Sequence, residues 1–169
     1  MKRVVFVFIL LVAGIGLTQC KISYSFTGAS ISPLVKTYTV EGFPNRAKQI
    51  NPTLSDYLAE ELRDKFTHQT SLDYANNGGD LEFGGSITGY DVKPISVTSS
   101  DEAAQNRLTV KINVKFTNNL DHDQDFENEF SAYADFDSDL NLSDVEDDLV
   151  EEIITQIVDD IFNKSVANW

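Results

Sequence analysis

LTVKINVKF, residues 108–116, alternates strictly between apolar and polar side chains. This period of two is typical of a β-strand that has one face in the core and the other in water. The apolar positions are Leu108, Val110, Ile112, Val114 and Phe116. The opposite parity aligns three cations, Arg107, Lys111 and Lys115, on the other side of the strand. The stretch therefore predicts a sheet with one buried face and one polar face.

Three further strands and two helices are expected around this strand. Residues 36–43, 81–90 and 126–136 are alternating or β-branched segments between turn signals, which predicts strands. Apolar residues recur at helical spacing after residue 51 as far as about residue 68, and again from 145 to 166. The resulting β-α-β-β-β-α order predicts an α+β two-layer sandwich. Two helices would cover one face of a four-stranded, mostly antiparallel sheet.

Local signals refine the ends of these elements. Asn51 stands before Pro52, so Asn51 is expected to cap the first helix. Ser143 and Glu146 have the spacing of a capping box at the start of the second helix. Three glycines between residues 84 and 89 indicate a bulge or a close approach of backbones in the second strand.

The N-terminus carries the features of an export signal. Lys2 and Arg3 precede an uncharged apolar run over residues 4–17, which is too short to span a membrane. The run ends in LTQC (17–20), which resembles the lipobox of bacterial lipoproteins. That resemblance implies a signal peptide over residues 1–19 and lipidation of Cys20 with diacylglyceryl and N-acyl groups.

The remaining chain then divides into two parts. Residues 20–34 form a lipidated tether, and residues 35–169 form a single α+β domain. Multiple acyl chains give stable anchoring where a single chain binds a membrane only marginally. Cys20 is the only cysteine, so the chain cannot form an internal disulfide. Lys21 follows the cysteine where an aspartate would favour retention in the inner membrane, so we expect the outer membrane.

The charge of the chain excludes a simple nucleic-acid binder. The net charge is −14, whereas nucleic-acid binding requires a basic surface. Sixteen acidic residues and no Lys or Arg lie between Asp121 and Asp160. This segment is either a solvated acidic face or a surface for a basic partner or divalent cations.

No enzyme or resident metal is expected. Asp135, Asp137, Asp139 and Glu146 match positions of a calcium-loop template, but Leu140 occupies the position that requires glycine. His68 and His122 have no companions at metal-ligand spacing. The chain has no nucleophile elbow and no phosphate-binding glycine loop.

Several short segments resemble the family of LPS-assembly lipoproteins called LptE, in a short and divergent form. They are YSFTGASI (24–31), FPNRA (43–47), NPTLS (51–55), NRLTV (106–110) and DIFNKSVANW (160–169). The resemblance implies a lipid-anchored protein on the periplasmic face of the outer membrane. It also implies that the protein plugs and helps to assemble the β-barrel LptD, and that it assists lipopolysaccharide transport.

The cations offer candidate contacts for lipopolysaccharide or the barrel. Arg107, Lys111 and Lys115 form the main row, and Arg46 with Lys48 forms a second group. The row could equally be a solvated strand face, or an edge strand guarded by lysine. An alternative function is a free-standing periplasmic lipoprotein that binds a small ligand or a cation.

Replacing Cys20 tests the anchor. The Cys20→Ser variant should lack acyl groups and retain its signal peptide, because the acceptor thiol is missing. Intact-mass spectrometry of the membrane fraction would measure both changes. A Cys20→Ser protein with the same mass modification as the wild type would contradict lipidation at this residue.

Overall fold

The computed structural model describes residues 31–95 and 104–167, so the predicted signal peptide, Cys20 and most of the predicted tether lie outside the described residues. The strands are β1 (Thr37–Val40), β2 (Asp73–Tyr74), β3 (Leu81–Ile95), β4 (Gln105–Asn118) and β5 (Phe126–Asp137). The helices are α2 (Leu54–Gln69) and α3 (Leu142–Phe162), and α3 continues into a π-helical turn, Asn163–Ala167. A 3₁₀ turn, His122–Gln124, precedes β5.

The sheet has five strands in the order β2-β1-β3-β4-β5. Strand β1 pairs in parallel with both β2 and β3, while β3, β4 and β5 pair antiparallel. The predicted four-stranded, mostly antiparallel sheet is therefore wrong in strand number and in the pairing of β1. Strand β2 has only two residues, too few to show a periodicity. The crossover through α2 makes β1 and β2 parallel, as in other strand-helix-strand units.

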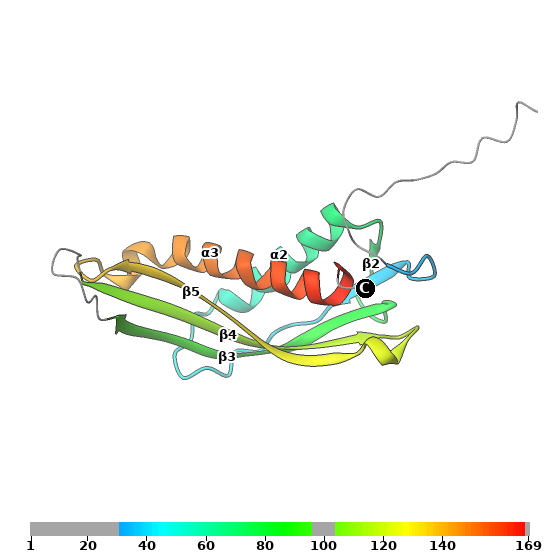
Figure 1. Cartoon of the computed structure of the whole chain (residues 1–169), viewed down its shortest axis with the longest axis horizontal. Coiled ribbons are helices and arrows are strands. Elements are labelled where there is room, and N and C mark those ends of the chain that lie inside the picture. The colour runs from blue at the N-terminus through cyan, green and yellow to red at the C-terminus, as the bar shows by residue number, and fades with distance from the viewer. Residues whose placement is uncertain (1–30, 96–103, 168–169) are drawn as a thin grey trace, which may run out of the picture.

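Both helices cover the same face of this sheet (Figure 1), as the α+β two-layer architecture requires. The predicted parity of β4 is confirmed, because all five apolar side chains of residues 108–116 are buried. The apolar stripe of α3 packs over them, and it is buried at Leu149, Val150, Ile153, Ile154, Ile157, Val158, Ile161 and Phe162. Burying each large side chain is worth about 1.5–3 kcal/mol, so α3 is held firmly on the sheet.

A hydrogen-bonded cluster joins the two helices to β3. The first helix has Thr53 as its N-cap, so the predicted cap at Asn51 is displaced by two residues. Asn51 still supports that helix, because its Oδ1 accepts hydrogen bonds from the backbone N–H groups of Thr53 (3.0 Å) and Leu54 (3.1 Å). Its Nδ2 donates to Glu146 Oε1 on α3 at 3.1 Å.

The capping box predicted for Ser143 and Glu146 is wrong. The N-cap of α3 is Asn141, and it makes no side-chain capping bond. Glu146 instead accepts hydrogen bonds from Asn51 and from the hydroxyl of Tyr90. Burial and the bond to Glu146 raise the pKa of the Tyr90 phenol, so Tyr90 remains a neutral donor. Both partners of Glu146 are distant in sequence, so no local motif reveals them.

Removing the Glu146 carboxylate should destabilise the fold. Glu146→Ala leaves the hydroxyl of Tyr90, a residue only 4% exposed, without its acceptor. The expected loss in free energy of unfolding is about 1–3 kcal/mol, measured by urea titration. Asp148→Ala is the matched control, because Asp148 is exposed on the same helix, and it should change stability by less than about 0.5 kcal/mol. Equal stability of the two variants would contradict the role of Glu146.

Candidate functional site

The cations of β4 lie on the face of the sheet that the helices leave uncovered. Arg107, Lys111 and Lys115 alternate with the buried side chains of the strand. Strand β4 lies between β3 and β5, so the interpretation of the row as a guarded edge strand is wrong. The three cations therefore belong to a central strand of an outward-facing, charged sheet surface.

Two of the three cations are paired with acids of β5. Arg107 donates to both carboxylate oxygens of Asp135, at 2.7 and 2.8 Å, and its guanidinium lies 3.6 Å from the ring centroid of Tyr133. This bond to Arg107 lowers the pKa of Asp135. Lys111 Nζ lies 3.5 Å from Glu129 Oε1. The charges of Arg107 and Lys111 are therefore paired within the sheet itself.

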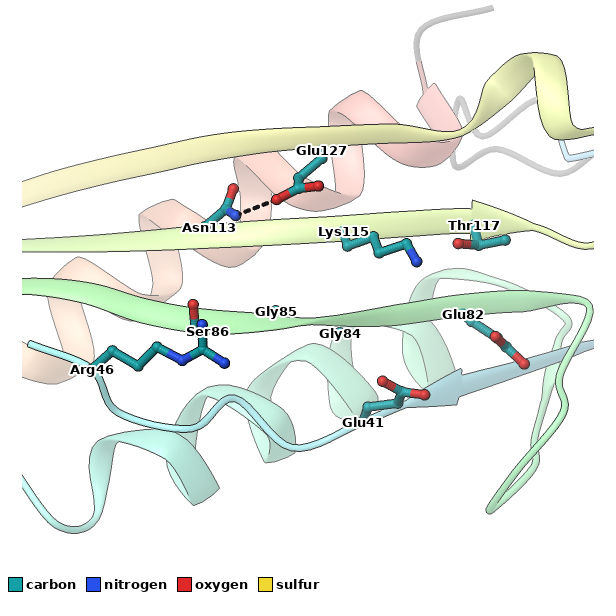
Figure 2. A pocket seen from close by; sticks show the side chains of 10 residues that line it. All are labelled: Glu41, Arg46, Glu82, Gly84, Gly85, Ser86, Asn113, Lys115, Thr117 and Glu127. Atoms are coloured by element: carbon teal, nitrogen blue, oxygen red, sulfur yellow. Dashed lines mark hydrogen bonds between the residues drawn. The ribbon is translucent and has the colours of Figure 1, made fainter.

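Lys115 instead lines a cavity together with Arg46, which comes from the other predicted group of cations (Figure 2). The cavity has a volume of about 250 Å³. Its remaining lining residues are Glu41, Glu82, Gly84, Gly85, Ser86, Asn113, Thr117 and Glu127. Within the part of the chain that the structure describes, neither Arg46 nor Lys115 forms an ion pair. Lys48 is exposed and does not line the cavity.

The segment after β1 places Arg46 beside this cavity. It follows β3 through backbone hydrogen bonds from Glu41 N to Phe83 O at 2.7 Å and from Arg46 N to Ile87 O at 2.8 Å. Ile87 N in turn donates to Pro44 O at 3.1 Å. The predicted strand over residues 36–43 ends before Arg46, so residue spacing could not predict that Arg46 and Lys115 line one cavity.

Two glycines form the floor of the cavity. Gly85 has a φ of +152°, and a Cβ at this position would lie 2.0 Å from the carbonyl oxygen of Asn113. A Cβ on Gly84 would lie 2.7 Å from Glu41 Oε2. Gly85 confirms the predicted close approach of backbones, whereas Gly84 makes room for the side chain of Glu41. A register shift between Ile87 and Gly89 marks an irregularity nearby.

The cavity is lined by one guanidinium and one ammonium group, each of which can contact an anionic group. Arginine and lysine both bind phosphate, arginine through a bidentate fork. Three carboxylates in the same cavity, from Glu41, Glu82 and Glu127, oppose an anion. Anion binding therefore depends on the Arg46 and Lys115 side of the cavity and should weaken as salt is added.

A second, more apolar cavity lies at the end of the domain where the tether enters. Its volume is about 280 Å³, and Ile31, Pro33, Val35, Leu81 and Val166 contribute its apolar lining. It contains no cationic side chain among its lining residues. This cavity suits an apolar group rather than a phosphate.

The described residues contain no cluster of three or more His, Cys, Asp or Glu side chains arranged to hold a metal ion. The residues of the calcium template are dispersed, with Asp135 on β5 and Glu146 bound to Tyr90. Over residues 31–95 and 104–167, no helix has the length and apolarity needed to cross a membrane.

The architecture is that of a small α+β two-layer domain, and solved structures of bacterial lipoproteins share it. A minor lipoprotein from Acinetobacter baumannii matches with a TM-score of 0.50 and 13% identity, over 78% of this chain and 92% of the other. The rare lipoprotein B from Shewanella oneidensis matches with a TM-score of 0.52 and 12% identity, over 76% of this chain and 92% of the other. At these identities the likeness shows the fold alone.

The sequence itself defines the family. The model of the LptE lipopolysaccharide-assembly family matches residues 35–165, and the chain belongs to this family. A search of curated proteins finds no match to the sequence. The family is one of non-enzymatic lipoproteins in lipopolysaccharide assembly, and the predicted relationship is confirmed.

A side chain at the cavity floor should disrupt the domain. Gly85→Ala would force a residue with a side chain to adopt a positive φ and would bring its Cβ against Asn113. We expect a loss of about 2–4 kcal/mol in free energy of unfolding, measured by urea titration. Gly42→Ala is the control, because nothing lies within 4 Å of a Cβ there. Two variants of equal stability would contradict the close approach of β3 and β4.

Proposed function

We propose that this chain is an outer-membrane lipoprotein, anchored through acyl groups on Cys20, that works with the β-barrel LptD to deliver lipopolysaccharide to the cell surface. The observation that carries this proposal is the family match over residues 35–165. The lipobox-like segment is not needed for that match, since residues 17–20 (LTQC) lie before it. The export signal and the family match are thus independent sequence features that favour the same location.

The surface of the domain is suited to the lumen of a barrel. The interior walls of outer-membrane barrels are polar, and some barrels are closed by a plug. The uncovered sheet face presents the ion pairs of Arg107 with Asp135 and of Lys111 with Glu129. The net charge of −14 adds to this polar character. A polar plug in a polar lumen is therefore the arrangement that we propose for the complex with LptD.

Direct contact with lipopolysaccharide is proposed at the cavity lined by Arg46 and Lys115. Of the five candidate cations, these two share a cavity and have no ion pair among the described residues. Arg107 and Lys111 are engaged by Asp135 and Glu129. The guanidinium and the ammonium group can each form charge-assisted hydrogen bonds with a phosphate group of lipopolysaccharide.

The second candidate is a free-standing periplasmic lipoprotein that binds a small apolar ligand. The apolar cavity of about 280 Å³ near Ile31 and Val166 favours this function. It predicts a protein that purifies from membranes alone and binds its ligand without a barrel.

Substitution of the two cavity cations tests contact with lipopolysaccharide. The Arg46→Gln/Lys115→Gln double variant should bind lipopolysaccharide roughly tenfold or more weakly, because two charge-assisted hydrogen bonds are lost. Binding of the purified full chain to fluorescent lipopolysaccharide in detergent would measure the effect.

Lys48→Gln/Lys111→Gln is the matched control, because it changes the net charge equally outside the cavity. It should bind within about twofold of the wild type. Equal weakening of both double variants would indicate only a general charge effect and would contradict a site at Arg46 and Lys115.

A further inference from the structure

Strand β5 forms a long and open edge of the sheet. It has twelve residues and stands last in the strand order, with its pairing to β4 unbroken from Phe126 to Asp137. The opposite edge is β2, which has only two residues. The sheet therefore offers one edge that is long enough to accept a further strand (Figure 1).

The hydrogen-bond pattern identifies which backbone groups of β5 are open. Ser138 N donates to Ala104 O at 3.0 Å, just beyond the pair of Gln105 with Asp137. Hydrogen-bonded pairs recur at every second residue of an antiparallel ladder, so the even-numbered residues of β5 bond to β4. The odd-numbered residues point their N–H and C=O groups to the open edge: Glu127, Glu129, Ser131, Tyr133 and Asp135.

These outward groups have no partner within residues 31–95 and 104–167. The backbone hydrogen bonds outside the regular elements include none from residues 127–135. Asp137, by contrast, already accepts from Leu140 N at 3.1 Å in the turn before α3. An added strand would thus find a row of donors and acceptors that ends where the turn begins.

Strand β5 lacks three of the features that protect natural edge strands, namely lysine, proline and a bulge. Residues 126–137 contain no Lys, Arg, Pro or Gly and no register shift. The strand instead presents exposed acids at Glu127, Glu129, Asp135 and Asp137. Glu129 and Asp135 already pair with Lys111 and Arg107, whereas Glu127 and Asp137 form no ion pair among the described residues. The like charges of these two acids oppose pairing with a second copy of β5 and favour a basic strand.

The side chains of β5 that face the helices indicate that a partner strand would need apolar residues on the same face. Phe126 and Phe130 are only partly buried, whereas Ala132, Ala134 and Phe136 are buried. A strand added beside β5 would shield the two phenylalanines with its own side chains on that face. On the opposite face, the alternate side chains of the added strand would lie beside the acids of β5.

We propose that the β5 edge binds an extended segment of a partner protein in which apolar and basic residues alternate. Main-chain hydrogen bonds would supply affinity, and the alternating side chains would supply specificity. This proposal does not depend on a role in lipopolysaccharide transport.

A synthetic peptide of nine alternating lysine and valine residues tests the proposal with the full chain in detergent. Amide hydrogen exchange should slow at the odd-numbered residues of β5, which are open before binding, and change little at the even-numbered ones. A peptide of the same composition with its lysines and valines in two blocks should give no such alternation. Uniform slowing, or slowing outside β5, would overturn the proposal.

Ser131→Pro separates strand addition from general attraction between a basic peptide and an acidic protein. Proline would remove an outward N–H while leaving the ladder to β4 intact. We expect peptide binding to weaken roughly tenfold in Ser131→Pro and to be unchanged in Ser131→Ala, which keeps the N–H. Circular dichroism would establish that both variants are folded.

Equal binding by folded Ser131→Pro and Ser131→Ala would exclude the β5 edge as the binding surface. Sedimentation without peptide gives a second test. A concentration-dependent dimer that Ser131→Pro disrupts would show that the edge pairs with a second copy, which contradicts the proposed basic partner.

Discussion

The side-chain alternation of β4 is the constraint on which both faces of the molecule depend. Because neighbouring residues of a strand point to opposite faces, burial of Leu108 and Val110 forces Arg107 and Lys111 outward. The helices occupy only the apolar face, where the stripe of α3 meets the strand. A shift of one residue in register would place the cations under α3, so the packing of the helix also fixes the polarity of the uncovered face.

On the uncovered face, some of the described cations are paired with acids and others are not. Arg107 and Lys111 are paired across to β5, whereas Lys115 and Arg46 both line a cavity and form no ion pair among the described residues. These two cations are therefore available for contacts on a protein whose net charge is −14. Glu129 and Asp135 of β5 are the partners in these pairs, whereas Glu127 and Asp137 form no ion pair among the described residues. The latter two acids lie on the strand whose backbone edge is open.

Sequence patterns predicted the elements with strong periodicity and failed where the structure depends on contacts between residues that are distant in sequence. The alternation of β4, the apolar stripe of α3 and the close approach at Gly85 all follow from local residue types. Strand β2 was not predictable, because its two residues depend on pairing with β1 after a helical crossover. Glu146 fits a capping box locally, yet its partners are Asn51 and Tyr90. Likewise, Arg46 lines the same cavity as Lys115 only because residues 41–46 follow β3.

Family membership and fold together lead to one physical expectation, a lipoprotein whose polar surface is enclosed by an outer-membrane barrel. Purification of the tagged full chain from detergent-solubilised outer membranes, with mass spectrometry of its partners, measures this directly. We predict that one large β-barrel protein, LptD, copurifies at near one-to-one stoichiometry and remains bound through size-exclusion chromatography. A protein that elutes alone at low detergent and low salt would contradict the enclosed-plug arrangement.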